Sequence, residues 1–127
     1  MNATSSGSGL MVLVAGPYRS GTGDDPAKLQ ANVDAMYAAA LEVFEAGHLP
    51  VTGEALALPV IEQAGGAHGD AVFDRIFHPI ARRLAVRCDA VLRIGGPSAG
   101  ADEMVELVTG AGGRVFHAVS ELPAVAS

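Results

Sequence analysis

The sequence is poor in cysteine, lysine and aromatic side chains, and it contains no tryptophan. The single cysteine, Cys88, has no partner for an intramolecular disulfide, which fits a reducing compartment. No apolar run approaches the roughly 20 residues that a membrane-spanning helix needs. We therefore expect a cytoplasmic protein that folds without disulfides and does not associate with membranes.

Positive charge is also scarce. The 14 acidic side chains outnumber the 8 basic ones, the formal net charge is −6, and Lys28 is the only lysine. Proteins that bind duplex nucleic acid depend on many Lys and Arg contacts to phosphate, so duplex nucleic acid is not an expected partner. A chain of 127 residues can bury roughly two-thirds of its unfolded surface, enough for one core. We expect a single domain over 10–127, preceded by a small, polar, disordered tail over 1–9, and a small-molecule ligand.

Several standard motifs are missing. A P-loop needs a Gly-Lys-Ser/Thr ending, but Lys28 falls within a predicted helix. The turn Gly16–Gly21 lacks the Gly-x-Gly-x-x-Gly spacing of a dinucleotide site. No histidine has a Cys or His partner at metal-ligand spacing, and Cys88 is typical of a buried small hydrophobe. The sequence predicts no metal site and no cofactor.

Apolar runs and helical periodicity alternate along the chain. Strands are predicted at Leu10–Ala15, His48–Thr52, Cys88–Ile94 and Arg114–Val119. A helix capped by Asp25 is predicted to run from Pro26 to Ala46, and another of about three turns to begin after Ser98. Between them, 54–63 has helical composition interrupted by Pro59, and a helical stretch from Asp70 to Arg87 is expected to kink or divide at Pro79.

This order predicts an α/β fold. Strands that alternate with helices pair in parallel through right-handed crossovers. We expect a three-layer, flavodoxin-like (Rossmann-like) sandwich with a four- to five-stranded parallel sheet, whose strand order is 2-1-3-4.

Two Gly-rich turns follow the first and third predicted strands, at Gly16–Gly21 and Gly95–Ala101. In an open parallel sheet, ligands bind beyond the carboxyl ends of the strands. The second turn enters a helix, whose N–H groups and dipole favour a phosphate or carboxylate, and Ser98 adds a hydroxyl. We expect Arg19 to converge with Ser98 on this anion. The alternatives are that the turns are Gly-rich only because the chain reverses tightly, and that Arg19 is a solvated loop cation.

Carboxylates are the best candidates for chemistry. Asp102, Glu103 and Glu106 lie in the first two turns of the helix that follows Ser98. Solvated side chains that complement the helix dipole are the alternative explanation. Asp89, at the opposite end of its strand, is expected to be structural.

Five short motifs in order resemble the nucleoside 2-deoxyribosyltransferase-like superfamily, and within it the DUF4406 branch. They are Gly16-Pro17-Tyr18, Asn32, Gly47-His48-Leu49-Pro50-Val51, Cys88-Asp89-Ala90-Val91 and Ser98-x-Gly-Ala101, and the resemblance spans 10–119. It implies a flavodoxin-like fold and an enzyme that hydrolyses or transfers the N-glycosidic bond of a nucleoside or a nucleoside 5′-monophosphate. It also implies assembly into a homodimer or larger oligomer. Large apolar residues in 54–63 and 70–80 favour assembly as well.

The resemblance implies roles for particular residues. Glu103 is the candidate nucleophile, and Tyr18 positions Glu103 or the sugar. Substrate would be held by the residues of the two turns: Gly16, Pro17, Tyr18, Arg19, Ser98, Gly100 and Ala101.

The sequence departs from the family pattern at one position. In Ser-x-Gly-x-x-x-Glu the glutamate falls six residues after the serine, where this chain has Met104. One residue turns a helical side chain by about 100°. Either Glu103 serves because the turn is shifted by one residue, or the activity has been lost. The alternative function is therefore a non-catalytic nucleotide-binding module, or an interaction domain that acts through an oligomeric surface.

Overall fold

The computed structural model describes residues 9–19, 21–23, 25–67 and 70–125, and the tail predicted over 1–9 lies outside them except for Gly9. Within these ranges four strands form one sheet: β1 (Met11–Ala15), β2 (Leu49–Val51), β3 (Ala90–Arg93) and β4 (Arg114–Phe116). All three strand pairs are parallel, in the order β2-β1-β3-β4. The predicted strand order is confirmed, and the described sheet has four strands rather than five.

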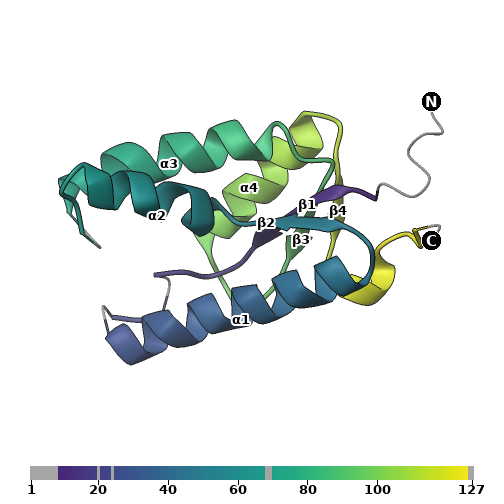
Figure 1. Ribbon diagram of the computed structural model, residues 1–127, viewed down its shortest axis with the longest axis horizontal. Helices are drawn as coiled ribbons and strands as arrows, with labels where there is room; N and C mark the ends of the chain where they lie inside the picture. The colour runs from purple at the N-terminus through teal and green to yellow at the C-terminus, as the bar shows by residue number, and fades with distance from the viewer. Residues whose placement is uncertain (1–8, 20, 24, 68–69, 126–127) are drawn as a thin grey trace.

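Four α-helices and a short 3₁₀ helix connect and cover the strands. They are α1 (Pro26–Glu45), α2 (Gly53–Gln63), α3 (Ala71–Ala85), α4 (Ala99–Gly110) and η2 (Val119–Glu121). Figure 1 shows α1 along one side of the sheet, while α3 and α4 cover the opposite side and α2 lies beside α3. This is the predicted three-layer α/β sandwich. No helix among the described residues is long and apolar enough to cross a membrane.

Alternation along β1 divides the core between the two faces of the sheet. Val12 and Val14 pack in the cluster that includes Met36 of α1, whereas Leu13 packs with Leu84 of α3. Successive strand residues point to opposite faces, so a strand covered on both sides must be apolar throughout. This explains why the run Leu10–Ala15 contains no polar residue.

Each of the four α-helices begins after a residue whose side chain bonds the first turn. Asp25, Thr52, Asp70 and Ser98 accept hydrogen bonds from backbone N–H groups two or three residues ahead. Such caps satisfy donors that have no partner within the helix. The predicted helix starts at Asp25, Asp70 and Ser98 are confirmed, while Thr52 caps α2 rather than ending a strand.

The two internal prolines do not break their helices. Pro59 lies within α2 and Pro79 within α3, and both helices are continuous. The expected interruption at Pro59 and division at Pro79 are therefore wrong. Proline removes one hydrogen bond from a helix, and here that loss is offset by the packing of α2 on α3 around Ile61 and Phe73.

His48 and Asp89 form hydrogen bonds with backbone groups at the strand ends and in the C-terminal loop. The Nδ1 atom of buried His48 accepts a hydrogen bond from the Leu10 N–H at 2.9 Å, and its Nε2 lies 2.9 Å from the Pro123 carbonyl oxygen. Asp89 accepts a bond of 2.8 Å from the Met11 N–H. The structural role expected for Asp89 is consistent with this bond, and β3 itself begins one residue later.

Candidate functional site

A cavity of about 220 Å³ opens at the carboxyl end of β1. Its walls come from β1 and the loop that follows it, the start of α2, one side of α3 and the first turns of α4. The lining residues are Leu13, Val14, Ala15, Gly16, Tyr18, Arg19, Gly53, Glu54, Phe73, Phe77, His78, Ala81, Ser98, Gly100, Ala101, Glu103 and Met104. This is where ligands bind in open parallel sheets, and the two Gly-rich turns meet here as predicted from the strand order.

Of the predicted site residues, all but one line this cavity. The exception is Pro17, which lies behind the wall against Gly95: a Cβ added to Gly95 would come within 2.6 Å of the Pro17 Cδ atom. Gly95 also has a φ of 77°, which favours glycine. Pro17 therefore joins the two turns to each other.

The first turn brings an aromatic and a cationic side chain to the cavity. Tyr18 is buried, and its backbone carbonyl accepts a 2.8 Å hydrogen bond from the side-chain amide of Asn32. The Arg19 guanidinium lies 3.8 Å from a carboxylate oxygen of Asp74 and 5.6 Å from the centre of the Phe73 ring. The Arg19 side chain thus contacts two residues of α3 and remains partly exposed, at 36 %.

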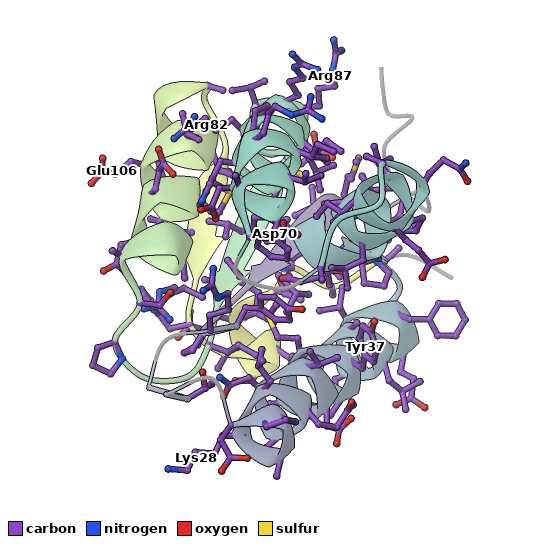
Figure 2. The ribbon with its side chains drawn as sticks, turned by 90° about the vertical axis from the view of Figure 1, so that its left-hand side faces the viewer. Lys28, Tyr37, Asp70, Arg82, Arg87 and Glu106 are labelled. Atoms are coloured by element: carbon purple, nitrogen blue, oxygen red, sulfur yellow. The ribbon has the colours of Figure 1, made fainter. Side chains whose placement is uncertain are left out.

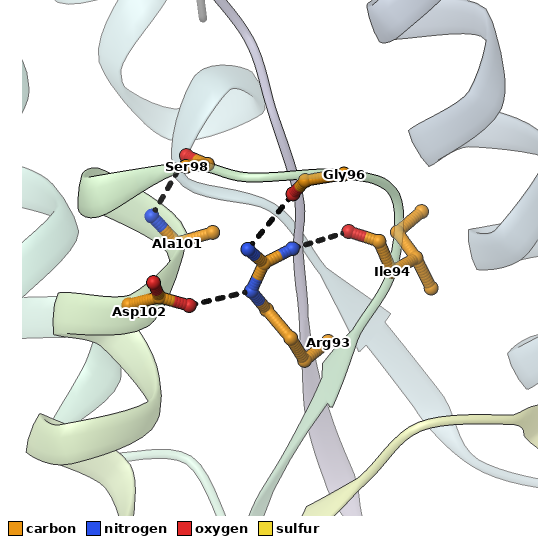
Figure 3. A network of polar contacts seen from close by, with 6 residues as sticks. All are labelled: Arg93, Ile94, Gly96, Ser98, Ala101 and Asp102. Carbon is orange, nitrogen blue, oxygen red and sulfur yellow. Dashed lines mark hydrogen bonds and ion pairs between the residues drawn. The ribbon is translucent and has the colours of Figure 1, made fainter.

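The second turn is built around Ser98 and Arg93 (Figure 3). Ser98 Oγ accepts a hydrogen bond of 3.1 Å from the Ala101 N–H. The mostly buried Arg93 side chain bonds the carbonyl oxygens of Ile94 and Gly96, and its Nε lies 3.0 Å from Asp102 Oδ1. Arg93 therefore stabilises the turn through these hydrogen bonds. Asp102 pairs with Arg93 and is not one of the residues that line the cavity.

The three acidic residues of α4 differ in their surroundings. Glu103 lines the cavity and forms an ion pair with Arg82 of α3, with 3.2 Å between Oε2 and Nε. Glu106 is exposed and points away from α3, as Figure 2 shows. Met104 also lines the cavity and packs against the apolar cluster that contains Leu84 and Val108. The carboxylate nearest in sequence to the expected position is thus the one that reaches the cavity.

A further carboxyl group of the site, Glu54, was not predicted from the sequence. It is only 6 % exposed, lines the cavity from the first turn of α2, and its Oε2 atom has no hydrogen-bond partner among the described residues. Burial raises the pKa of Glu54 to about 7, against a smaller opposing effect of its own backbone N–H. One signal was available: Glu54 follows the end of a predicted strand by two residues, on the same edge as the Gly-rich turns.

Aromatic residues of α3 were missed as well. The rings of Phe73 and Phe77 have centroids 5.0 Å apart, and both are nearly parallel to the Tyr18 ring, at 6.2 and 6.0 Å. His78 contacts Phe77 edge-on at 5.7 Å. The four-residue spacing of Phe73 and Phe77 places both on one helix face, but sequence alone does not tell that this face meets Tyr18.

The charge of Glu54 acts on Tyr18. The pKa of Tyr18 is raised, first by burial and then by the negative charge of Glu54, while Arg19 acts in the opposite direction. One small cavity is therefore lined by the rings of Tyr18, Phe73 and Phe77, which together form an aromatic wall. The same cavity is lined by the buried Glu54, the ion-paired Glu103 and the cationic Arg19. Cys88 is not among its lining residues; burial and then the charge of Asp89 raise the pKa of its thiol to about 11.

Comparison with models of known protein families finds no match to this chain, and comparison with curated proteins finds no significant match.

Proposed function

We propose that the protein binds a nucleoside or a nucleoside 5′-monophosphate in this cavity and breaks its N-glycosidic bond, by hydrolysis or by transfer. The observation that carries the proposal is the combination of the aromatic wall with Glu54 and Glu103, which line the cavity from different helices. Parallel aromatic rings offer a surface for a flat base. Carboxyl groups supply what glycosidic chemistry needs, because the transition state carries positive charge on the sugar.

Glu103 is the proposed nucleophile. Its carboxylate pairs with Arg82 and is 38 % exposed. A carboxylate under the anomeric carbon either bonds to it or stabilises the cationic sugar. Tyr18 is proposed to position Glu103 or the sugar.

The phosphate site is proposed at the two turns. Arg19, Ser98, Gly100 and Ala101 line the same cavity, at the N-terminus of α4. The Ala101 N–H is already bonded to Ser98 Oγ, so the backbone contribution falls mainly to the preceding N–H of Gly100. Arg19 would exchange its contact with Asp74 for the phosphate, which forms stronger charge-assisted hydrogen bonds.

The phosphate site is tested by thermal unfolding with paired ligands. Nucleoside 5′-monophosphates are expected to raise the melting temperature more than the matching nucleosides, and Arg19→Ala is expected to remove the difference. Lys28→Ala, at an exposed position on α1 (Figure 2), is the control and should retain it. Equal stabilisation by both ligand classes would refute the phosphate site.

The activity is tested by incubating the protein with a panel of deoxynucleosides, ribonucleosides and their 5′-monophosphates. Free base, separated by chromatography, is the expected product, with or without a second base as acceptor. If no member of the panel releases base at a rate above the uncatalysed one, the proposed activity is wrong.

The second candidate is a nucleotide-binding module without catalysis. The observation that favours it is Met104, which stands where the family pattern has glutamate and packs against the apolar core. Under this alternative, ligands stabilise the fold but no base is released, and Met104→Glu restores release. Base release by the unmodified protein would exclude it.

The homodimer or larger oligomer remains part of the proposal, as does the cytoplasmic location. The apolar surplus expected in 70–80 is largely absorbed, since Phe73 is buried, but Leu56 and Val60 of α2 remain about half exposed. Tyr37, Leu41 and Phe44 of α1 are also exposed, as is Leu49 of the edge strand β2. These side chains supply apolar surface for an interface. A monomeric mass by light scattering at micromolar concentration would contradict assembly.

A further inference from the structure

Glu54 is not the residue that caps α2. The capping side chains of the four α-helices accept hydrogen bonds from backbone N–H groups. In α2 the cap is Thr52, whose hydroxyl oxygen accepts a hydrogen bond from the Ala55 N–H. Glu54 Oε2 is buried without a hydrogen-bond partner among the described residues. Leaving a buried carboxyl unsatisfied costs free energy, and buried polar groups are nearly always paired. A ligand bound in the cavity would supply the hydrogen-bond partner that Glu54 Oε2 lacks among the described residues.

The groups that share the cavity with Glu54 do not neutralise it. The titratable and charged side chains lining the cavity are Tyr18 and Arg19 from the loop after β1, His78 from α3 and Glu103 from α4. Arg19 is engaged by Asp74, and Glu103 is engaged by Arg82. The phenol of Tyr18 carries no positive charge. No ion pair to Glu54 forms among the described residues, so its environment favours the neutral acid near pH 7.

Glu54 and Glu103 therefore have contrasting environments. Glu103 is partly exposed and faces a guanidinium, which suits a carboxylate that acts with its negative charge. Glu54 is buried beside the aromatic wall, with Tyr18 and Phe73 lining the same cavity. Pairs of carboxyl groups whose surroundings differ in this way divide the acid and nucleophile roles in glycosidic catalysis.

We propose that Glu54 is the general acid of the site, and that it gives its proton to the base as the N-glycosidic bond breaks. This inference rests on the proposed function and assigns a catalytic residue to it. The bond between the anomeric carbon and the base nitrogen breaks, and its electron pair stays on the base, which takes the proton of Glu54. The anomeric carbon bonds to Glu103, or directly to water.

The cycle closes with a proton returned to Glu54. When water attacks the anomeric carbon, the Glu54 carboxylate takes one proton from it. The sum is nucleoside plus water giving free base plus free sugar, and no other reactant is required. In transfer, the second base replaces water and gives its own N–H proton to Glu54.

Two leaving groups separate this role from a structural one. A purine or pyrimidine needs a proton to leave, whereas para-nitrophenolate leaves as an anion. For Glu54→Gln we expect base release from the best nucleoside of the panel to fall by roughly 100-fold or more, the usual value of a general acid. Release of para-nitrophenolate from the para-nitrophenyl glycoside of the same sugar, measured in the first turnover, is expected to stay within about threefold of the unmodified protein, because departure of this leaving group needs no acid and precedes the step in which Glu54 takes a proton from water.

The pH profile gives a second readout. The rate of base release by the unmodified protein should decline above about pH 7, where Glu54 loses its proton, and this decline should be absent in Glu54→Gln. Glu54→Asp keeps an acid and should keep a decline, which guards against a Gln variant that folds poorly. Glu62→Gln, exposed on the same helix, is the matched control and should behave as the unmodified protein.

Each outcome decides between the two proposals. If Glu54→Gln slows both leaving groups equally, or neither, Glu54 is not the acid and the proposed function stands without it. If the unmodified protein cleaves neither compound, the proposed function fails and the role of Glu54 fails with it. A loss confined to the nucleoside, with the pH decline removed, supports both.

Discussion

Replacing Glu54 by glutamine should make the protein more stable at neutral and alkaline pH. In the folded state burial raises the pKa of this carboxyl from 4.5 to about 7, whereas in the unfolded chain it is exposed to water. Glutamine is nearly isosteric and cannot ionise. The variant therefore removes the cost of placing a charge at this position, and leaves the volume of the side chain unchanged.

The magnitude and its direction follow from the two pKa values. Below pH 4.5 the Glu54 carboxyl is neutral in the folded and the unfolded state, so its ionisation does not change the free energy of unfolding. As the pH rises toward 7, the unfolded chain loses the proton first, so the unfolded state is favoured and stability falls. Above pH 7 the penalty is complete, at about 3 kcal/mol for a shift of this size.

The assay is urea unfolding of both proteins at several values between pH 5 and 8. The free-energy difference between Glu54→Gln and the unmodified protein should grow in favour of the variant by about 2–3 kcal/mol across this range. Groups common to both proteins cancel in the difference, and Glu62→Gln should show no such growth. A difference that stays constant with pH would refute the burial of an unpaired Glu54.

Three further predictions concern other parts of the site. Gly95→Ala should lower the free energy of unfolding by roughly 1–3 kcal/mol, because the left-handed backbone is strained for alanine and its Cβ would meet Pro17. Gly96→Ala, whose Cβ has open space, should not, and equal effects of the two in urea unfolding would contradict the reasoning. Arg82→Ala should change the free energy of unfolding by less than about 1 kcal/mol, because the ion pair of Arg82 with Glu103 is partly exposed. A larger loss in urea unfolding would contradict this reasoning. Burial raises the pKa of the Cys88 thiol to about 11, so it should react with a disulfide reagent at pH 8 only as fast as the protein unfolds, and rapid labelling would count against it.

The strand order could be predicted because it depends on local patterns. The apolar run at Leu10–Ala15, the caps at Asp25 and Ser98, and Gly47 after the first helix each have a mechanism that acts within a few residues. Once strands and helices alternate, the handedness of crossovers leaves few arrangements. The predicted meeting of the two Gly-rich turns followed from that topology.

The prolines show where local reasoning fails. A proline costs a helix one hydrogen bond, but the sequence does not show what packs on that helix. In the structure α2 and α3 lie against each other around Ile61 and Phe73, and this contact stabilises both helices through Pro59 and Pro79. Tertiary packing therefore overrides the local preference.

Glu54 was missed for a related reason. A glutamate in the first turn of a helix is usually solvated and favourable to the helix dipole. Tyr18 and Phe73, which line the same cavity, belong to other elements, and nothing in the sequence shows that they share a cavity with Glu54. Asp74, which pairs with Arg19, lies on another element as well. The predicted residues other than Pro17 thus meet at one cavity, as the topology led us to expect, and the prediction left out Glu54 and the aromatic residues of α3.

The most direct test of the central claim compares base release by two single variants of α4. Glu103 lines the cavity and Glu106 is exposed three residues later, so the pair differs in position and not in chemistry. The account predicts that Glu103→Gln abolishes release of free base from the best nucleoside or nucleoside 5′-monophosphate, while Glu106→Gln retains it. Undiminished release by Glu103→Gln, or equal loss in both variants, would contradict the account.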